Sequence, residues 1–169
     1  GCTQHFEKIM DNIRELQGGI AKLLFNAKRL HDGIAVVYSP ASVHLTLLLG
    51  DGLPGASEWE GQSTDSPAFV YMHCWEALTL LLRDLGFSYD VIPSSALEDG
   101  AVLERDYRLL VMPLNLRVTE KEAETVRRFV KGGGTLLTDA FLGAFTDPVR
   151  PSDGGVLKDV LGLQFDRGI

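Results

Sequence analysis

The residues of this sequence that could do chemistry are a serine–histidine group, a single aspartate, an asparagine and a tryptophan. These candidates are Ser39, Ser42, His44, Trp59, Asn115 and Asp139. Ser39 and Ser42 lie close to His44 along the chain, and an imidazole that takes the proton of a hydroxyl makes it a nucleophile. No Gly-x-Ser-x-Gly turn surrounds either serine, however. Helix capping by Ser42 and a surface position for His44 are therefore the favoured interpretation.

Asp139 lies in the stretch KGGGTLLTDAF, which covers residues 131–141. Three glycines followed by an apolar run and an acid could form a phosphate loop, but such a loop follows a strand and precedes a helix. Here the predicted order is reversed. A glycosidase needs two carboxylates at one cleft, and most other acids of the chain fall on helix faces or in turns. Capping of the following turn is thus favoured over catalysis for Asp139.

Trp59 and Asn115 fit a different chemistry, the binding of a sugar. Trp59 lies in a segment, 50–67, that is rich in Gly, Ser, Asp and Pro, and long irregular segments of this kind are often functional. An indole ring can stack on a sugar face while Asn115 and the hydroxyls bond to it. A small stand-alone hydrolase or sugar-binding module is the alternative function that this group supports.

Charge and composition exclude several classes of function. The net charge is −7 and the isoelectric point about 5.0, so we expect no nucleic-acid partner, because phosphate binding needs a basic surface. Cys2 and Cys74 have no zinc-ligand spacing, and we expect neither a metal nor a cofactor. The sequence lacks the roughly 20 consecutive apolar residues of a membrane helix, and we expect no membrane partner. It leaves a cytoplasmic or an exported location open.

The elements that must position the candidates begin with a long amphipathic helix over 4–30. Its apolar residues recur every three or four positions, and Gly18–Gly19 predicts a kink or break, since each glycine costs about 1 kcal/mol relative to alanine in a helix. Short apolar strands and helices then alternate. The predicted strands are 34–38, 89–93, 107–113 and 135–138, and the predicted helices are 42–49, 68–85 and one capped by the box Thr119 to Glu122.

This alternation predicts an α/β fold, a three-layer sandwich with a mainly parallel, flavodoxin-like sheet. Ligands of such sheets bind at the carboxyl ends of the strands. Ser39, Asn115 and Asp139 each follow a predicted strand, so they would meet at that edge.

Several segments together resemble the central domain of family forty-two glycoside hydrolases. They are the residues GIAKLL from Gly19, HDGIAVVYSPASVH from His31, LGFSYDV from Leu85, LLVMP from Leu109 and FVKGGGTL from Phe129. The likeness covers about residues 19–165. It is to the β-galactosidase trimerisation domain, whose fold is similar to that of class I glutamine amidotransferases.

The resemblance implies that residues 1–30 form a linker helix leaving a catalytic β/α barrel, and that 31–169 form an amidotransferase-like domain truncated at its C-terminus. Both catalytic carboxylates of such enzymes lie in the barrel. Where an amidotransferase would carry its cysteine, this chain has Thr138-Asp139-Ala140-Phe141, so we expect no catalytic residue here. We expect the isolated chain to be inactive, as the non-catalytic oligomerisation or accessory domain of a larger glycoside hydrolase.

The expected partners are the barrel of the parent chain and further copies of this chain. The resemblance favours a trimer, with a dimer next, formed through the 4–30 helix and the 50–67 segment. Carbohydrate remains a ligand only in the alternative function.

Overall fold

The structure is a computed structural model of the chain and describes residues 2–27, 30–49, 68–139, 141–147 and 150–163. The chain forms two compact units, residues 1–30 and 31–169. In the part of the chain that the structure describes, no helix is both long and apolar enough to span a bilayer.

The first unit is a helix interrupted at the predicted glycines. Helix α1 (Cys2–Glu15) runs into a π-helical turn, Leu16–Ile20, and then into α2 (Ala21–Asn26). Gly19 leaves the helical conformation with φ 170° and ψ −45°, which confirms the predicted break. A single helix cannot bury its own apolar stripe, and the large side chains along it are exposed: Phe6, Ile9, Ile13, Leu16, Ile20, Leu23 and Leu24.

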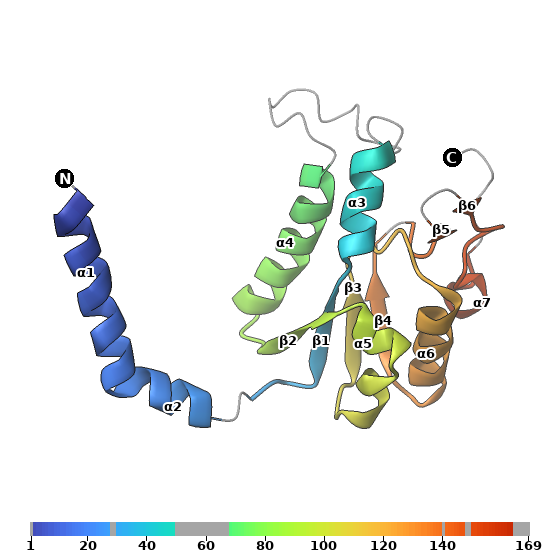
Figure 1. Cartoon of the computed structure of the whole chain (residues 1–169). Coiled ribbons are helices and arrows are strands. Elements are labelled where there is room, and N and C mark those ends of the chain that lie inside the picture. The colour runs from blue at the N-terminus through green and yellow to red at the C-terminus, as the bar shows by residue number, and fades with distance from the viewer. Residues whose placement is uncertain (1, 28–29, 50–67, 140, 148–149, 164–169) are drawn as a thin grey trace. The chain divides into compact units, whose positions relative to one another are not determined.

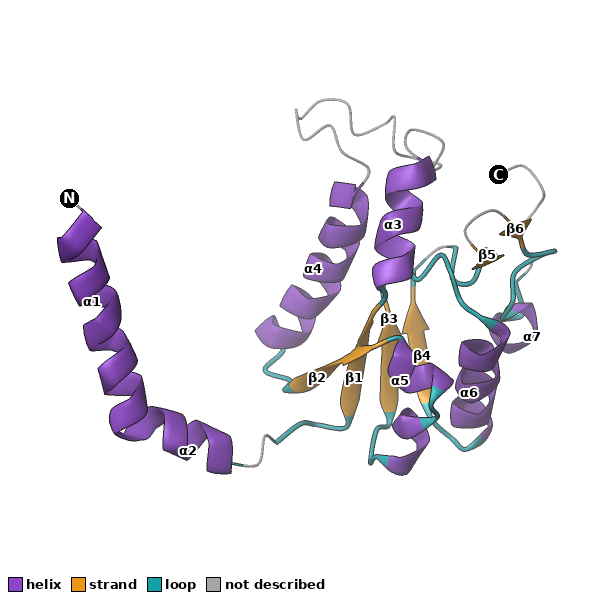
Figure 2. Cartoon of the chain, viewed as in Figure 1, coloured by secondary structure: helices purple, strands orange, loops and turns teal. Residues whose placement is uncertain are grey.

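The second unit contains a four-stranded, all-parallel sheet in the order β2-β1-β3-β4 (Figures 1 and 2). Its strands are β1 (Ile34–Tyr38), β2 (Tyr89–Pro93), β3 (Leu109–Met112) and β4 (Thr135–Thr138). Val36 is aligned with Val91 on one side and with Val111 on the other. The predicted α/β class with a parallel sheet is therefore confirmed.

Helices cover both faces of the sheet and make a three-layer sandwich. On one face, Ile34, Val36 and Val111 pack against Leu82 of α4 (Ala68–Asp84), and α3 (Pro40–Leu49) packs beside α4. The other face packs on α5 (Ser95–Glu98), the 3-10 turn Ala101–Glu104, α6 (Glu120–Lys131) and α7 (Lys158–Leu161). Alternate side chains of β1 pack on opposite faces of the sheet, because successive side chains of a strand point to opposite sides.

Two boundaries differ from the sequence prediction for local reasons. The strand predicted over 107–113 is only Leu109–Met112, because the Tyr107 N–H bonds locally to the Arg105 carbonyl and Pro113 has no N–H for the ladder. The helix predicted from Ser42 begins at Pro40, since proline suits the first helical turn. The antiparallel pair β5 (Phe145–Asp147) and β6 (Arg150–Pro151), α5 and α7 were not predicted, as each is four residues or shorter.

The glycines of the 131–141 stretch end α6 and precede β4, as the sequence predicted. Gly132 caps α6, its N–H bonding to the carbonyl of Arg128, and Gly133 takes a left-handed conformation with φ 95°. At the other end of α6 the capping box is complete. The Thr119 hydroxyl accepts the Glu122 N–H at 3.2 Å, and the Glu122 carboxylate accepts the Thr119 N–H at 2.7 Å.

Replacing Thr119 by alanine should lower the free energy of unfolding by about 1 kcal/mol, because the Glu122 N–H loses its acceptor at a helix end. The Thr119 hydroxyl also donates to Glu98 at 3.1 Å, and that bond is lost as well. Urea unfolding followed by circular dichroism measures the change. Lys121→Ala, an exposed position in the same helical turn, is the matched control and should change stability little. Equal stabilities of the two variants would contradict the role of the box.

Candidate functional site

The carboxyl ends of β1, β3 and β4 meet at one edge of the sheet, which we call the strand-end rim. It consists here of Ser39 and Ser42 after β1, the segment 113–118 after β3, and Asp139 after β4. A second apolar cluster lies over this rim. Its buried members are Leu45, Tyr71, Leu114, Leu116, Ala144 and Phe145. The rim is thus the only place where the sequence-predicted candidates come together among the described residues.

The two serines of the rim are buried, and their hydroxyls bond to main-chain N–H groups and not to a catalytic base. Their hydroxyls lie 3.0 Å apart, and their exposed fractions are 1% for Ser39 and 0% for Ser42. Ser39 Oγ accepts the Ser42 N–H at 3.2 Å, so Ser39, and not Ser42 as predicted, caps α3. Ser42 Oγ accepts the Arg117 N–H at 3.2 Å. This bond ties the start of α3 to the segment after β3.

Asp139 also bonds to the main chain. Its partner lies after β3, whereas the sequence analysis predicted that it caps the turn that follows it. Both its carboxylate oxygens accept the N–H of Leu114, at 2.9 and 2.8 Å. Burial raises the pKa of Asp139 from 3.8 to about 6, against the lowering effect of the Leu114 bond. A buried carboxyl with a raised pKa can mark an active site. Here no neighbouring charge contributes to the shift, and the partner of the carboxylate is a main-chain amide.

The backbone on both sides of this bond is strained. Leu114 has φ 40° and Phe141 has φ 68°, a region that costs a residue with a Cβ about 1–2 kcal/mol. Strain of this kind often accompanies function. In this chain it turns Leu114 into the apolar cluster, where it is 6% exposed, and brings Phe141 against the same cluster. The strained turns therefore fill the rim with apolar side chains.

The remaining candidates do not complete a site. Asn115 is 1% exposed, and its amide donates to the Pro113 carbonyl at 2.9 Å. His44 is exposed on α3, in agreement with the surface position expected for it. Trp59 lies outside the described residues, as does the 50–67 segment. The structure brings together Ser39, Ser42, Asn115 and Asp139, without the histidine that a serine nucleophile requires.

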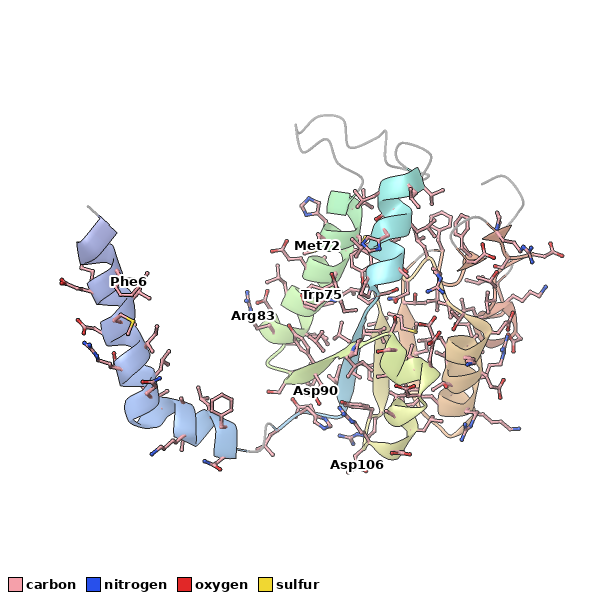
Figure 3. All side chains as sticks on the ribbon, viewed as in Figure 1. Phe6, Met72, Trp75, Arg83, Asp90 and Asp106 are labelled. Carbon is pink, nitrogen blue, oxygen red and sulfur yellow. The ribbon has the colours of Figure 1, made fainter. Side chains whose placement is uncertain are left out.

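Three residues at or next to the rim were not predicted from the sequence. The Tyr71 hydroxyl on α4 accepts the Ser39 N–H at 2.9 Å, and burial raises the pKa of Tyr71 to about 12. Arg117 Nε and Trp75 Nε1 are buried without a hydrogen-bond partner in the described part of the chain. Figure 3 shows Trp75 on α4. No local pattern could pair Tyr71 with Ser39, which is 32 positions away.

The polar groups of the rim bond to the main chain around them. Its hydroxyls, its amide and its carboxylate each bond to main chain. The two serines and Asn115 are buried, and Asp139 is half-buried. The described residues also include no cluster of three His, Cys, Asp or Glu side chains that could hold a metal ion.

Comparison with solved structures identifies similar folds. Most of the chain resembles part of several β-galactosidases. One is the β-galactosidase of Bifidobacterium adolescentis, with a TM-score of 0.58 and 18% identity over 80% of this chain and 56% of that one. Another is Gan42B, a GH42 β-galactosidase, with a TM-score of 0.56 and 20% identity over 78% of this chain and 17% of that one.

A third is the polyextremophilic β-galactosidase of the Antarctic haloarchaeon Halorubrum lacusprofundi, with a TM-score of 0.53 and 22% identity over 80% of this chain and 18% of that one. No protein-family profile matches the sequence, and no curated protein matches it. This chain therefore shares the fold of these enzymes over most of its own length, but spans only 17–56% of theirs.

Proposed function

We propose that this chain is a non-catalytic accessory domain of a larger glycoside hydrolase of the β-galactosidase type, related to family forty-two, and that it serves oligomerisation. The observation that carries the proposal is the asymmetry of the fold likeness. It covers about four fifths of this chain but less than one fifth of two of the β-galactosidases. A domain that accompanies a larger catalytic part has this relation to the complete enzyme.

The filled strand-end rim supports the non-catalytic half of the proposal. In an α/β sheet the rim is where a catalytic group would lie, and here Tyr71, Leu114 and the serines occupy it. We expect the gene of the parent protein to encode a β/α barrel upstream of this chain, in the same reading frame. Sequencing the gene around this chain tests that expectation directly.

The apolar stripe of the first unit supports the oligomerisation half. Leaving each large apolar side chain in water forgoes about 1.5–3 kcal/mol, and Phe6, Leu16 and Leu23 are 63%, 48% and 72% exposed. The charges of α1, such as Lys8 and Arg14, lie off this stripe. Such a helix gains from packing on another surface, and a trimer of the chain, with a dimer next, is the assembly we expect.

The purified chain should be inactive and should self-associate. Nitrophenyl galactosides and glutamine should be turned over at the rate of buffer alone, because the rim offers no accessible nucleophile or acid pair. Turnover that Asp139→Asn abolishes would contradict this assignment.

Light scattering coupled to size exclusion, at several concentrations, should give a trimer or a dimer.

Ile13→Glu, in the apolar stripe, should shift the chain toward the monomer, whereas Lys8→Glu, on the polar side of the same helix, should leave the assembly unchanged. Ile13 is 37% exposed, so the substitution acts on a surface and not on the core. A wild-type chain that is monomeric at high concentration, or an equal response of the two variants, would refute the role of this stripe.

A further inference from the structure

The three residues that precede β1 are held from several sides. Asp32 and Ser88 bond to each other twice, the Asp32 N–H to the Ser88 carbonyl at 2.9 Å and the Ser88 N–H to the Asp32 carboxylate at 2.7 Å. The Gly33 carbonyl accepts the N–H groups of Arg108 and Leu109 at 2.7 and 3.0 Å. The start of the α/β unit is therefore a built turn, and its geometry fixes the direction of the Gly33 N–H.

The acceptor of the Gly33 N–H is the His31 ring. Gly33 N lies 3.1 Å from His31 Nδ1. Gly33 has φ 77°, and a Cβ there would lie 3.1 Å from both Arg108 Nε and the Asp106 carbonyl, so this position of the turn favours glycine. An imidazole nitrogen accepts a hydrogen bond only when it carries no proton. The bond thus specifies neutral His31 with its proton on Nε2.

Titratable and charged groups face the other side of the ring. His31 Nε2 is 3.8 Å from the Asp90 carboxylate on β2, and the Tyr107 ring lies 5.0 Å from the imidazole between centroids. The Tyr107 hydroxyl donates to the same Asp90 oxygen at 2.9 Å and accepts from Arg105 at 3.1 Å. Figure 3 shows Asp90 at the end of the sheet where the chain enters β1.

We propose that His31 is a pH-operated contact, which holds the Gly33 amide when neutral and turns to Asp90 when protonated. A proton on Nδ1 removes the acceptor and sets two N–H groups against each other. The same proton creates a cation beside the Asp90 carboxylate, which lies 3.8 Å from Nε2. Acid therefore strengthens the His31–Asp90 contact and releases the Gly33 N–H, while the other bonds of the turn remain. This inference does not depend on the proposed function.

Amide and imidazole NMR of the whole chain between about pH 8 and pH 5 tests the proposal, because histidine changes charge in that range. The Gly33 amide proton should shift upfield with the same midpoint as the His31 ring. Its hydrogen-exchange protection should fall about tenfold, the equivalent of one lost hydrogen bond. Nitrogen-15 shifts of the ring should show the Nε2–H tautomer at high pH.

Two variants separate the proposal from a structural role of His31. His31→Asn keeps an oxygen that can accept the N–H two residues ahead, so the Gly33 amide should stay protected at every pH. Asp90→Asn removes the carboxylate that faces Nε2, and the Gly33 and His31 transitions should still share one midpoint. Exposed His44 should respond identically in all three proteins. A Gly33 amide that ignores the titration of His31, or that still shifts in His31→Asn, would overturn the proposal.

Discussion

Gly134→Ala is expected to destabilise the α/β unit by about 1–3 kcal/mol, the usual cost of overpacking a core. A Cβ at this position would overlap the ring of Phe129. That ring is 6% exposed and packed in the main core, so it has no free space to move into. The backbone cannot withdraw easily either, because the Gly134 N–H bonds to the Phe129 carbonyl at 3.0 Å. Urea unfolding monitored by circular dichroism gives the free energy.

Gly133→Ala is the matched control for this substitution. A Cβ on Gly133 meets nothing within 4 Å, but the residue has φ 95°, so its cost of about 1 kcal/mol comes from backbone strain alone. The variant Phe129→Leu removes the ring. In that background Gly134→Ala should cost less than in the wild type, since coupled neighbours are not additive. An unchanged cost would show that the ring is not the cause.

Asp139→Asn is expected to stabilise the chain at neutral pH by about 1–2 kcal/mol. Burial raises the folded-state pKa of Asp139 from 3.8 to about 6, so the folded state binds this proton more tightly than the unfolded state. The stability that Asp139 contributes is therefore fully present below about pH 4 and is lost as the pH rises through about 6. The full shift would correspond to about 3 kcal/mol, which partial exposure reduces. Asparagine keeps an oxygen for the Leu114 N–H without the buried charge.

The measurement is the free energy of unfolding of wild type and variant from pH 4 to pH 8. Their difference should be small at pH 4, grow through pH 6 and then stay level. Glu122, whose pKa burial also raises, is present in both proteins and cancels in the difference. Asp99→Asn, at an exposed position after α5, should give no such curve. A variant less stable than the wild type at pH 8 would show that the ionised carboxylate supports the rim.

These two substitutions concern the same stretch from opposite sides of β4. Its glycines fit the helix end and the Phe129 ring, and its Asp139 side chain accepts the N–H of Leu114 in the strained segment after β3. Both roles concern the fold.

The sequence alone determined the elements whose causes are local. Each of these causes acts over a few neighbouring residues. They are the apolar runs of β1 and β4, the glycines between α6 and β4, the break at Gly19 and the Thr119–Glu122 capping box. Those interactions are set by propensity, periodicity and capping, so they can be read without coordinates. The parallel sheet follows from the alternation of these elements.

The tertiary structure decided what the polar residues do. Asp139 and Leu114 are 25 positions apart, and Tyr71 and Ser39 are 32 apart. A local pattern cannot encode such pairs, because they form only when the ends of different strands and a helix are packed together. The same packing places Leu114 at φ 40°, which no propensity of leucine predicts. The sequence favoured capping for Ser42 and Asp139, but their actual partners, the N–H groups of Arg117 and Leu114, exist only in the folded chain.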